Sequence, residues 1–182
     1  MVTTRQRQAR VLRRTRRVHR YSGVALFAFF AVVGVTSVLL GWKKDAGWIM
    51  PPTSKVAGVE LSDFLPLDSL RAVAQGKGKN YVHNLPLTVD RLDVRPGKGI
   101  VKVLFNEEYY EMQLNGATGE VLSFGKRRSD LYESIHDGSI LDEWFGTGGI
   151  FKLVYSTVLG LALLVFTVSG FWLWYGPKRM RR

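Results

Sequence analysis

The sequence of 182 residues contains no cysteine and only three histidines. Without cysteine the chain cannot form disulfides, thiolate metal sites, iron–sulfur clusters or a cysteine nucleophile. Any folded domain must therefore be stable through its hydrophobic core alone. The sequence also lacks the G-x-S-x-G, H-E-x-x-H and phosphate-binding glycine-loop motifs that mark many hydrolases and nucleotide enzymes. We predict no catalytic residues, and a non-enzymatic role is favoured.

Acidic residues are absent from both ends of the chain. Met1–Arg20 holds eight arginines, the tail after Tyr175 holds four further Lys and Arg residues, and all 15 acidic residues lie between Asp45 and Glu143. Basic residues beside a membrane span favour the cytoplasmic side, so both termini are expected there. A net charge of +11 also fits nucleic-acid binding. Arginines next to a span instead attract anionic headgroups, so membrane lipids and not nucleic acid are the predicted partner.

Two long runs are nearly free of charge. These are Tyr21–Trp42 and Phe151–Tyr175, the second containing only Lys152. About 20 apolar residues suffice for a helix to cross the hydrocarbon core, so two transmembrane helices are predicted. No small-residue cleavage site follows the first run, which is therefore expected to remain as an anchor.

This pattern predicts a membrane protein whose termini are both cytoplasmic and whose central part is extracytoplasmic. The expected segments are a basic cytoplasmic leader (1–20), a first transmembrane helix (21–42), an extracytoplasmic domain with linkers (43–150), a second transmembrane helix (151–175) and a basic cytoplasmic tail (176–182).

The central segment has the pattern of a small α+β domain. A helical stripe runs from Leu61 to Ala74, and Gly76 is expected to end that helix. Alternating apolar residues separated by turns then predict an antiparallel meander of three or four strands between Leu87 and Phe124. After Gly125 only intermittent apolar residues follow, which could lie on the membrane surface or against the domain. The predicted fold class is an α+β membrane protein with two transmembrane helices flanking one helix and an antiparallel sheet.

Three stretches carry a family resemblance. His19–Gly23 opens an apolar run with a histidine, an aromatic residue and a glycine, Tyr110–Leu122 contains a T-G-E-V turn between strands, and Ile135–Gly138 precedes a helix ending in Ser169–Trp174. In this order they resemble the PepSY-associated transmembrane proteins, whose helices flank extracytoplasmic PepSY domains. The chain looks like a minimal two-span member, because relatives that reduce ferric siderophores have four or more spans.

The resemblance implies three roles. The leading one is a non-catalytic accessory or regulatory subunit of a larger membrane complex, with other membrane subunits or a second copy as partner. The second is a haem-binding electron-transfer or ferric-siderophore-reductase-like protein, since larger relatives hold haem between transmembrane histidines. The third is a regulator of a periplasmic peptidase.

The candidate haem ligands are His19 and His136, while His83 is expected at a strand edge or surface. A span of 22 residues is roughly 33 Å long, and His19 precedes the first span whereas His136 precedes the second. The two cannot be axial ligands of one haem within a single chain. No haem is therefore expected in the monomer, and haem binding requires histidines from a second chain. The cluster Glu107, Glu108 and Glu111 is interpreted as a solvated edge rather than a catalytic acid pair.

Small residues predict how the two spans meet. On a helical wheel they form one strip on each span, and such strips allow close backbone approach in membranes. The strips are Gly23, Gly34, Ser37 and Gly41 on the first span and Ser156, Gly160, Thr167 and Gly170 on the second. We expect the strips to face each other, with Gly34 near Gly160 at mid-membrane. His19 is expected to point toward the second helix near Trp174.

Overall fold

The computed structural model describes residues 4–82 and 85–181, so the expectation for His83 lies outside the described residues. Contacts divide the chain into two compact units. The helix unit is the chain up to Ser37 together with the chain from Ser134 onward, and the sheet domain is Val38–Glu133. The two units are described separately.

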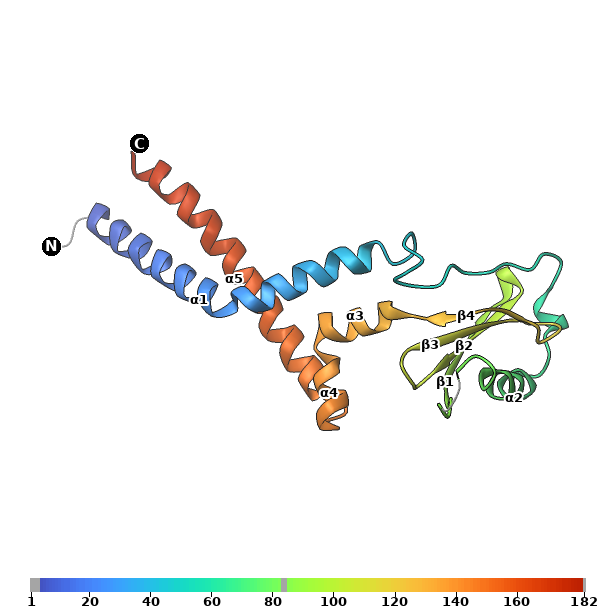
Figure 1. The fold of residues 1–182 in the computed structure, drawn as a ribbon. Coiled ribbons are helices and arrows are strands. Elements are labelled where there is room, and N and C mark those ends of the chain that lie inside the picture. The colour runs from blue at the N-terminus through green and yellow to red at the C-terminus, as the bar shows by residue number, and fades with distance from the viewer. Residues whose placement is uncertain (1–3, 83–84, 182) are drawn as a thin grey trace. The chain divides into compact units, whose positions relative to one another are not determined.

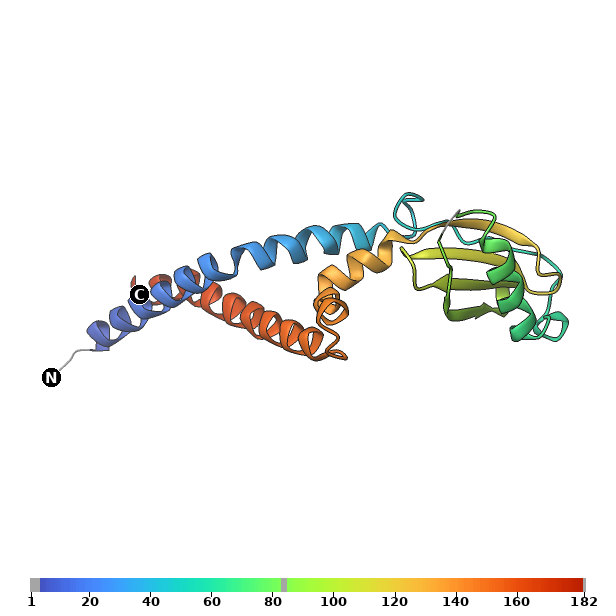
Figure 2. The same ribbon diagram turned by 60° about the horizontal axis from the view of Figure 1, so that its bottom comes forward.

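Two long helices dominate the helix unit. They are α1 (Thr4–Gly41) and α5 (Ile150–Arg181), each long and apolar enough to cross a membrane. The start of α1 and the end of α5 lie at the same end of the pair (Figures 1 and 2). The arginine-rich leader is thus an extension of the first helix. The second helix runs beyond the expected boundary at Tyr175, through Pro177, because a proline so near the helix end disrupts little of its hydrogen bonding.

Two shorter helices precede α5. They are α3 (Arg128–Asp137) and α4 (Ser139–Phe145), in a region where the sequence indicated only scattered apolar residues. Gly138 separates them with φ of +81°, and a Cβ at this position would lie 2.7 Å from the ring of Tyr155. Both facts require glycine here, because an L side chain would be strained and would collide.

The helix of the sheet domain is α2 (Leu67–Gly78), preceded by a short 3₁₀ turn η1 at Leu61–Asp63. The sequence pattern predicted a helix from Leu61 to Ala74, so both its predicted start and its predicted end come too early. Pro66 breaks the stripe because proline favours the first residues of a helix, so α2 begins after it. Gly76 lies inside α2 with no atom near its missing side chain, and glycine lowers helix stability without forbidding the helix.

The predicted meander is confirmed as four antiparallel strands in the order β1-β2-β3-β4. The strands are β1 (Val89–Arg95), β2 (Ile100–Phe105), β3 (Tyr110–Asn115) and β4 (Val121–Lys126). The turn between β2 and β3 places Glu108 and Tyr109 at positive φ. Gly99 and Gly119 supply the left-handed positions of the other two turns.

One face of the sheet packs against α2. Leu70 and Ala74 of α2 are fully buried against the apolar side chains of β2 and β3 that point toward the helix. Because side chains alternate across a strand, Val101 and Val103 of β2 and Met112 of β3 share this face. This packing forms the hydrophobic core of the domain.

The other face of the sheet is covered by the segment that follows α1, residues 49–56, which we call the strap. Ile49 is fully buried and its carbonyl accepts a hydrogen bond from the Ser129 N–H. The Gln113 side chain accepts from the Ser54 N–H at 2.7 Å and donates to the Pro52 carbonyl at 3.0 Å. Every residue of β2 is consequently buried, on both faces.

A charged cluster lies on the strap-covered face. The Glu111 carboxylate accepts from Lys102 at 3.0 Å and from Arg127 at 3.0 Å, and Gln113 also donates to it. Glu111 is only 1% exposed, so its assignment to a solvated edge was wrong. It alternates onto the covered face, and two cations compensate the burial of its charge.

Candidate functional site at the helix crossing

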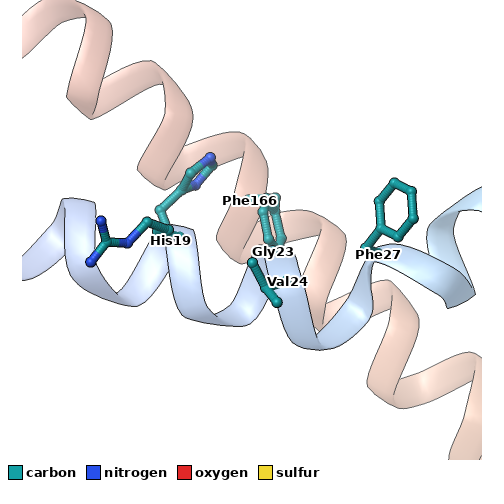
Figure 3. Close-up of a pocket in the computed structure, with 6 residues that line it drawn as sticks. His19, Gly23, Val24, Phe27 and Phe166 are labelled. Carbon is teal, nitrogen blue, oxygen red and sulfur yellow. The ribbon is translucent and has the colours of Figure 1, made fainter.

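The closest histidine contact in the helix unit lies where α1 crosses α5. His19 Nδ1 is 2.7 Å from Ser169 Oγ, and its ring centroid is 4.7 Å from that of Phe166. A Cβ on Gly170 would lie 3.7 Å from the imidazole. His19 therefore faces the second helix, as expected (Figure 3).

Small residues allow this close approach. A Cβ on Gly23 would be 3.3 Å from the Phe166 ring, which also packs edge-to-face on Phe30 at 5.4 Å. Toward the helix ends, a Cβ on Gly176 would meet Leu12 at 2.9 Å. Glycine at these positions lets the large side chain of one helix lie against the backbone of the other.

A shallow, mostly apolar groove of about 450 Å³ lies beside the crossing (Figure 3). It is lined by His19, Arg20, Gly23, Val24, Phe27 and Phe166. Arg20 is its one permanently charged residue. The groove can accept an apolar group that carries an acid at its Arg20 end.

The second candidate histidine also forms a hydrogen bond with a hydroxyl group of a neighbouring helix. His136, at the end of α3, places Nδ1 2.9 Å from Thr36 Oγ1 of α1. The Thr36 hydroxyl also donates to the Val32 carbonyl at 2.8 Å, and the Ser169 hydroxyl donates to the Phe166 carbonyl at 3.2 Å. In the tautomer with its hydrogen on Nδ1, each ring donates to its hydroxyl and leaves the Nε2 lone pair available.

The two histidines belong to separate places. His19 and Thr36, the partner of His136, are separated by about 25 Å along α1 at 1.5 Å per residue. Among residues 4–82 and 85–181, no group of three or more His, Asp or Glu side chains could hold a metal ion. Each histidine can offer one nitrogen ligand through Nε2, while the hydroxyl bonded to Nδ1 fixes the orientation of the ring.

The predicted pairing of Gly34 with Gly160 is wrong. Both residues are exposed, and no atom lies within 4 Å of a Cβ built on either. The physical reason is that α5 crosses α1 at an angle and does not follow its small-residue face (Figures 1 and 2). Only Gly23 and Gly170 of the two strips lie at the crossing.

The remaining strip residues do not face the partner helix. Ser37 and Thr167 are exposed and donate to carbonyls of their own helices, at Val33 and Leu163. Ser156 is exposed, with a long 3.4 Å hydrogen bond to the Asp137 carbonyl. Gly41 belongs to the segment that is grouped with the sheet domain, and no atom lies within 4 Å of a Cβ built on it.

Trp174 is not the neighbour of His19. Trp174 is 59% exposed, and the Lys178 ammonium lies over its ring, 3.8 Å from the centroid. The sequence did not single out Ser169 or Thr36 as histidine partners. Each histidine has a hydroxyl residue at a similar height on the helix it contacts, and this could have served as the signal. To select the correct hydroxyl, however, one must know where the helices meet.

Comparison with known families decides the assignment of the chain. A family model described as PepSY-associated TM region matches residues 2–182. The chain belongs to this PepSY-associated family. Family membership and the two long apolar helices identify a PepSY-related membrane protein. Comparisons with curated proteins and with solved structures found no match.

Proposed function

We propose that this PepSY-associated protein is a non-catalytic accessory or regulatory subunit of a larger complex in the bacterial cytoplasmic membrane. In this proposal both termini are cytoplasmic and residues 43–150 are periplasmic. The arginine-rich start of α1 and the basic end of α5, at one end of the pair, support this orientation. The partners are other membrane subunits or a second copy, within a lipid bilayer.

One observation carries the subunit role. The contacts between the two spans leave the small residues Gly34 on α1 and Gly160 on α5 exposed. Membrane helices gain little from hydrophobicity when they associate, and they associate where small residues permit close approach. A strip that its own chain leaves uncovered is therefore suited to a helix of another chain.

Affinity purification from native membranes in mild detergent tests the role. We expect a stoichiometric membrane partner with the wild-type chain, and its loss with Gly34→Leu or Gly160→Leu. Neither substitution should disturb the chain's own crossing, because no atom lies near either position. Ala28→Leu is the matched control, because Ala28 is exposed on another side of α1. Recovery of the wild-type chain alone, as a monomer, would refute the subunit role.

The histidine geometry supports a second candidate, haem binding between chains. Both His19 and His136 have Nδ1 fixed by a hydroxyl and can present Nε2 to a metal. Arg20 beside the groove could pair with a carboxylate of the bound group. When bound, haem would supply one-electron transfer, and this chain would provide one axial nitrogen at each position.

An absorption spectrum of the purified native assembly tests this candidate. A Soret band lost in His19→Ala or His136→Ala, with the assembly size unchanged, would favour the redox role. A featureless visible spectrum from protein produced with added haem would exclude it.

A further inference from the structure

Two large aromatic residues at the end of α4 are mostly exposed. Trp144 is 73% exposed and Phe145 is 66% exposed. They are continuous with the start of α5, since the Phe145 and Phe151 ring centroids are 5.3 Å apart and Ile150 is 63% exposed. The apolar surface of the second span thus extends onto α4.

The corner between α4 and α5 holds these aromatics in place. Asp142 of α4 accepts hydrogen bonds from the backbone N–H groups of Gly149, Phe151 and Lys152. The Thr147 hydroxyl also donates to it. The first N–H groups of a helix lack partners within the helix, so Asp142 caps α5 from the neighbouring helix.

Two charged side chains at this corner, Asp142 and Lys152, are compensated. Burial by itself raises the pKa of Asp142, but the hydrogen bonds from Thr147 and the backbone outweigh it and hold that pKa below its usual range. Lys152, the charged residue of the second apolar run, pairs with Asp137 at 2.6 Å. Asp142 and Lys152 are therefore both compensated where α5 begins, and Glu143 of α4 is exposed.

We propose that α4 lies on the membrane surface, with Trp144 and Phe145 inserted among bilayer phospholipids at the level where α5 enters the membrane. Aromatic side chains, tryptophan above all, prefer this interfacial level. The Asp142 corner transmits the position of the aromatics to α5, so α4 sets the depth and tilt of the second span. This inference rests on the membrane assignment of α5 and is independent of any partner complex.

A neighbouring groove fits the same lipids. It has a volume of about 220 Å³ and almost wholly apolar walls. Its lining includes Phe29 of α1, Leu141 of α4, and Phe151 and Tyr155 of α5. Because Phe151 joins this groove to Phe145, an acyl chain in the groove would belong to a lipid whose headgroup lies beside α4.

The test uses full-length protein in which Trp42, Trp48, Trp172 and Trp174 are replaced by Phe, so that Trp144 is the sole tryptophan. The protein is reconstituted into phosphatidylcholine vesicles with bromine at shallow or deep acyl positions. We expect the fluorescence emission of Trp144 to be blue-shifted, and we expect lipids with shallow bromines to quench most of this emission. Aqueous iodide should quench it several-fold less than it quenches a control. The control replaces Trp144 too and carries Leu61→Trp, on an exposed residue of the sheet domain.

Each outcome decides the inference. Iodide quenching of Trp144 equal to that of the control would overturn it, because the indole would then be in water. Shielding from both iodide and bromine would also overturn it, because protein would then cover α4. Flotation of the vesicles with bound protein verifies membrane insertion in every sample. The result does not depend on finding a partner subunit, so the two proposals fail separately.

Discussion

The sheet domain buries and pairs its side chains within the domain, whereas the helix unit leaves many of its side chains exposed. In the sheet domain both faces of β2 are covered, and even the buried charge of Glu111 has two cationic partners. In the helix unit, contacts concentrate at the crossing, and many large apolar side chains of α1 and α5 remain exposed. The comparison teaches that the domain is stabilised by its own packing, whereas the helices depend on lipid or on another chain.

The largest effect should come from breaking the buried cluster. Glu111→Ala leaves Lys102 buried without its anionic partner and should destabilise the sheet domain by about 3–5 kcal/mol. Hydrogen exchange of the β2 and β3 amides in detergent measures this loss. Glu108→Ala is the control, because Glu108 is exposed and its pair with Lys126 lies at the surface. Equal effects of the two substitutions would contradict the account.

The second prediction compares apolar side chains in the two units. Met112 is fully buried in the sheet core, so Met112→Ala should cost about 2–5 kcal/mol by the same exchange measurement. Leu161 of α5 is 60% exposed, and Leu161→Ala should change the stability of the reconstituted protein little, because lipid replaces lost contacts. A large loss with Leu161→Ala would mean that a protein surface covers this face.

The third prediction concerns the helix unit's tightest turn. Gly138→Ala forces an L side chain into positive φ and against the Tyr155 ring, and should destabilise the turn between α3 and α4 by about 1–3 kcal/mol. Exchange of the Leu141 amide, which donates to the Gly138 carbonyl, reports it. Gly146→Ala is the matched control, with positive φ but open space, and should have the smaller effect.

The smallest effect is a pH dependence at the surface of the sheet domain. Burial slightly raises the pKa of Glu107, but hydrogen bonds from the Thr88 hydroxyl and N–H outweigh it and lower that pKa. A lowered folded-state pKa contributes stability above the unfolded value of about 4.3, and this is lost as pH falls through the folded value. Because Glu107 lies at the surface, its contribution should stay below about 1 kcal/mol. Denaturant titrations of wild type and Glu107→Gln at pH 6 and pH 3 should converge at the lower pH.

Local patterns in the sequence were sufficient for the spans and the meander. Charge-free runs and alternation around the turns depend on neighbouring residues, so they can be read without knowing the fold. The strap was not predictable, because nothing near Pro52 or Gln113 in the sequence shows that they meet. The same limit misassigned Glu111, whose partner Arg127 comes from beyond β4.

The sequence predicted which way His19 faces but not which residue it contacts. His19 was expected to face the second helix, which it does, because wheel angles follow from sequence spacing. Its neighbour depends on the height and angle at which α5 crosses, and these are set by Phe166 filling the space beside Gly23. A strip of small residues shows where a helix can approach. It does not show which helix does so, as Gly34 demonstrates.

The cluster at Glu111 has a mechanical consequence. The chain enters the sheet domain through the strap, which is fastened to Gln113, and leaves it through Arg127, which is fastened to Glu111. Gln113 also donates to the Glu111 carboxylate at 2.8 Å, so both tethers end on one small group of side chains in β3. The Ser129 N–H also donates to the Ile49 carbonyl, which joins the two tethers directly. A force that pulls the tethers apart would therefore be borne by this backbone bond together with the side-chain bonds of Gln113 and Glu111.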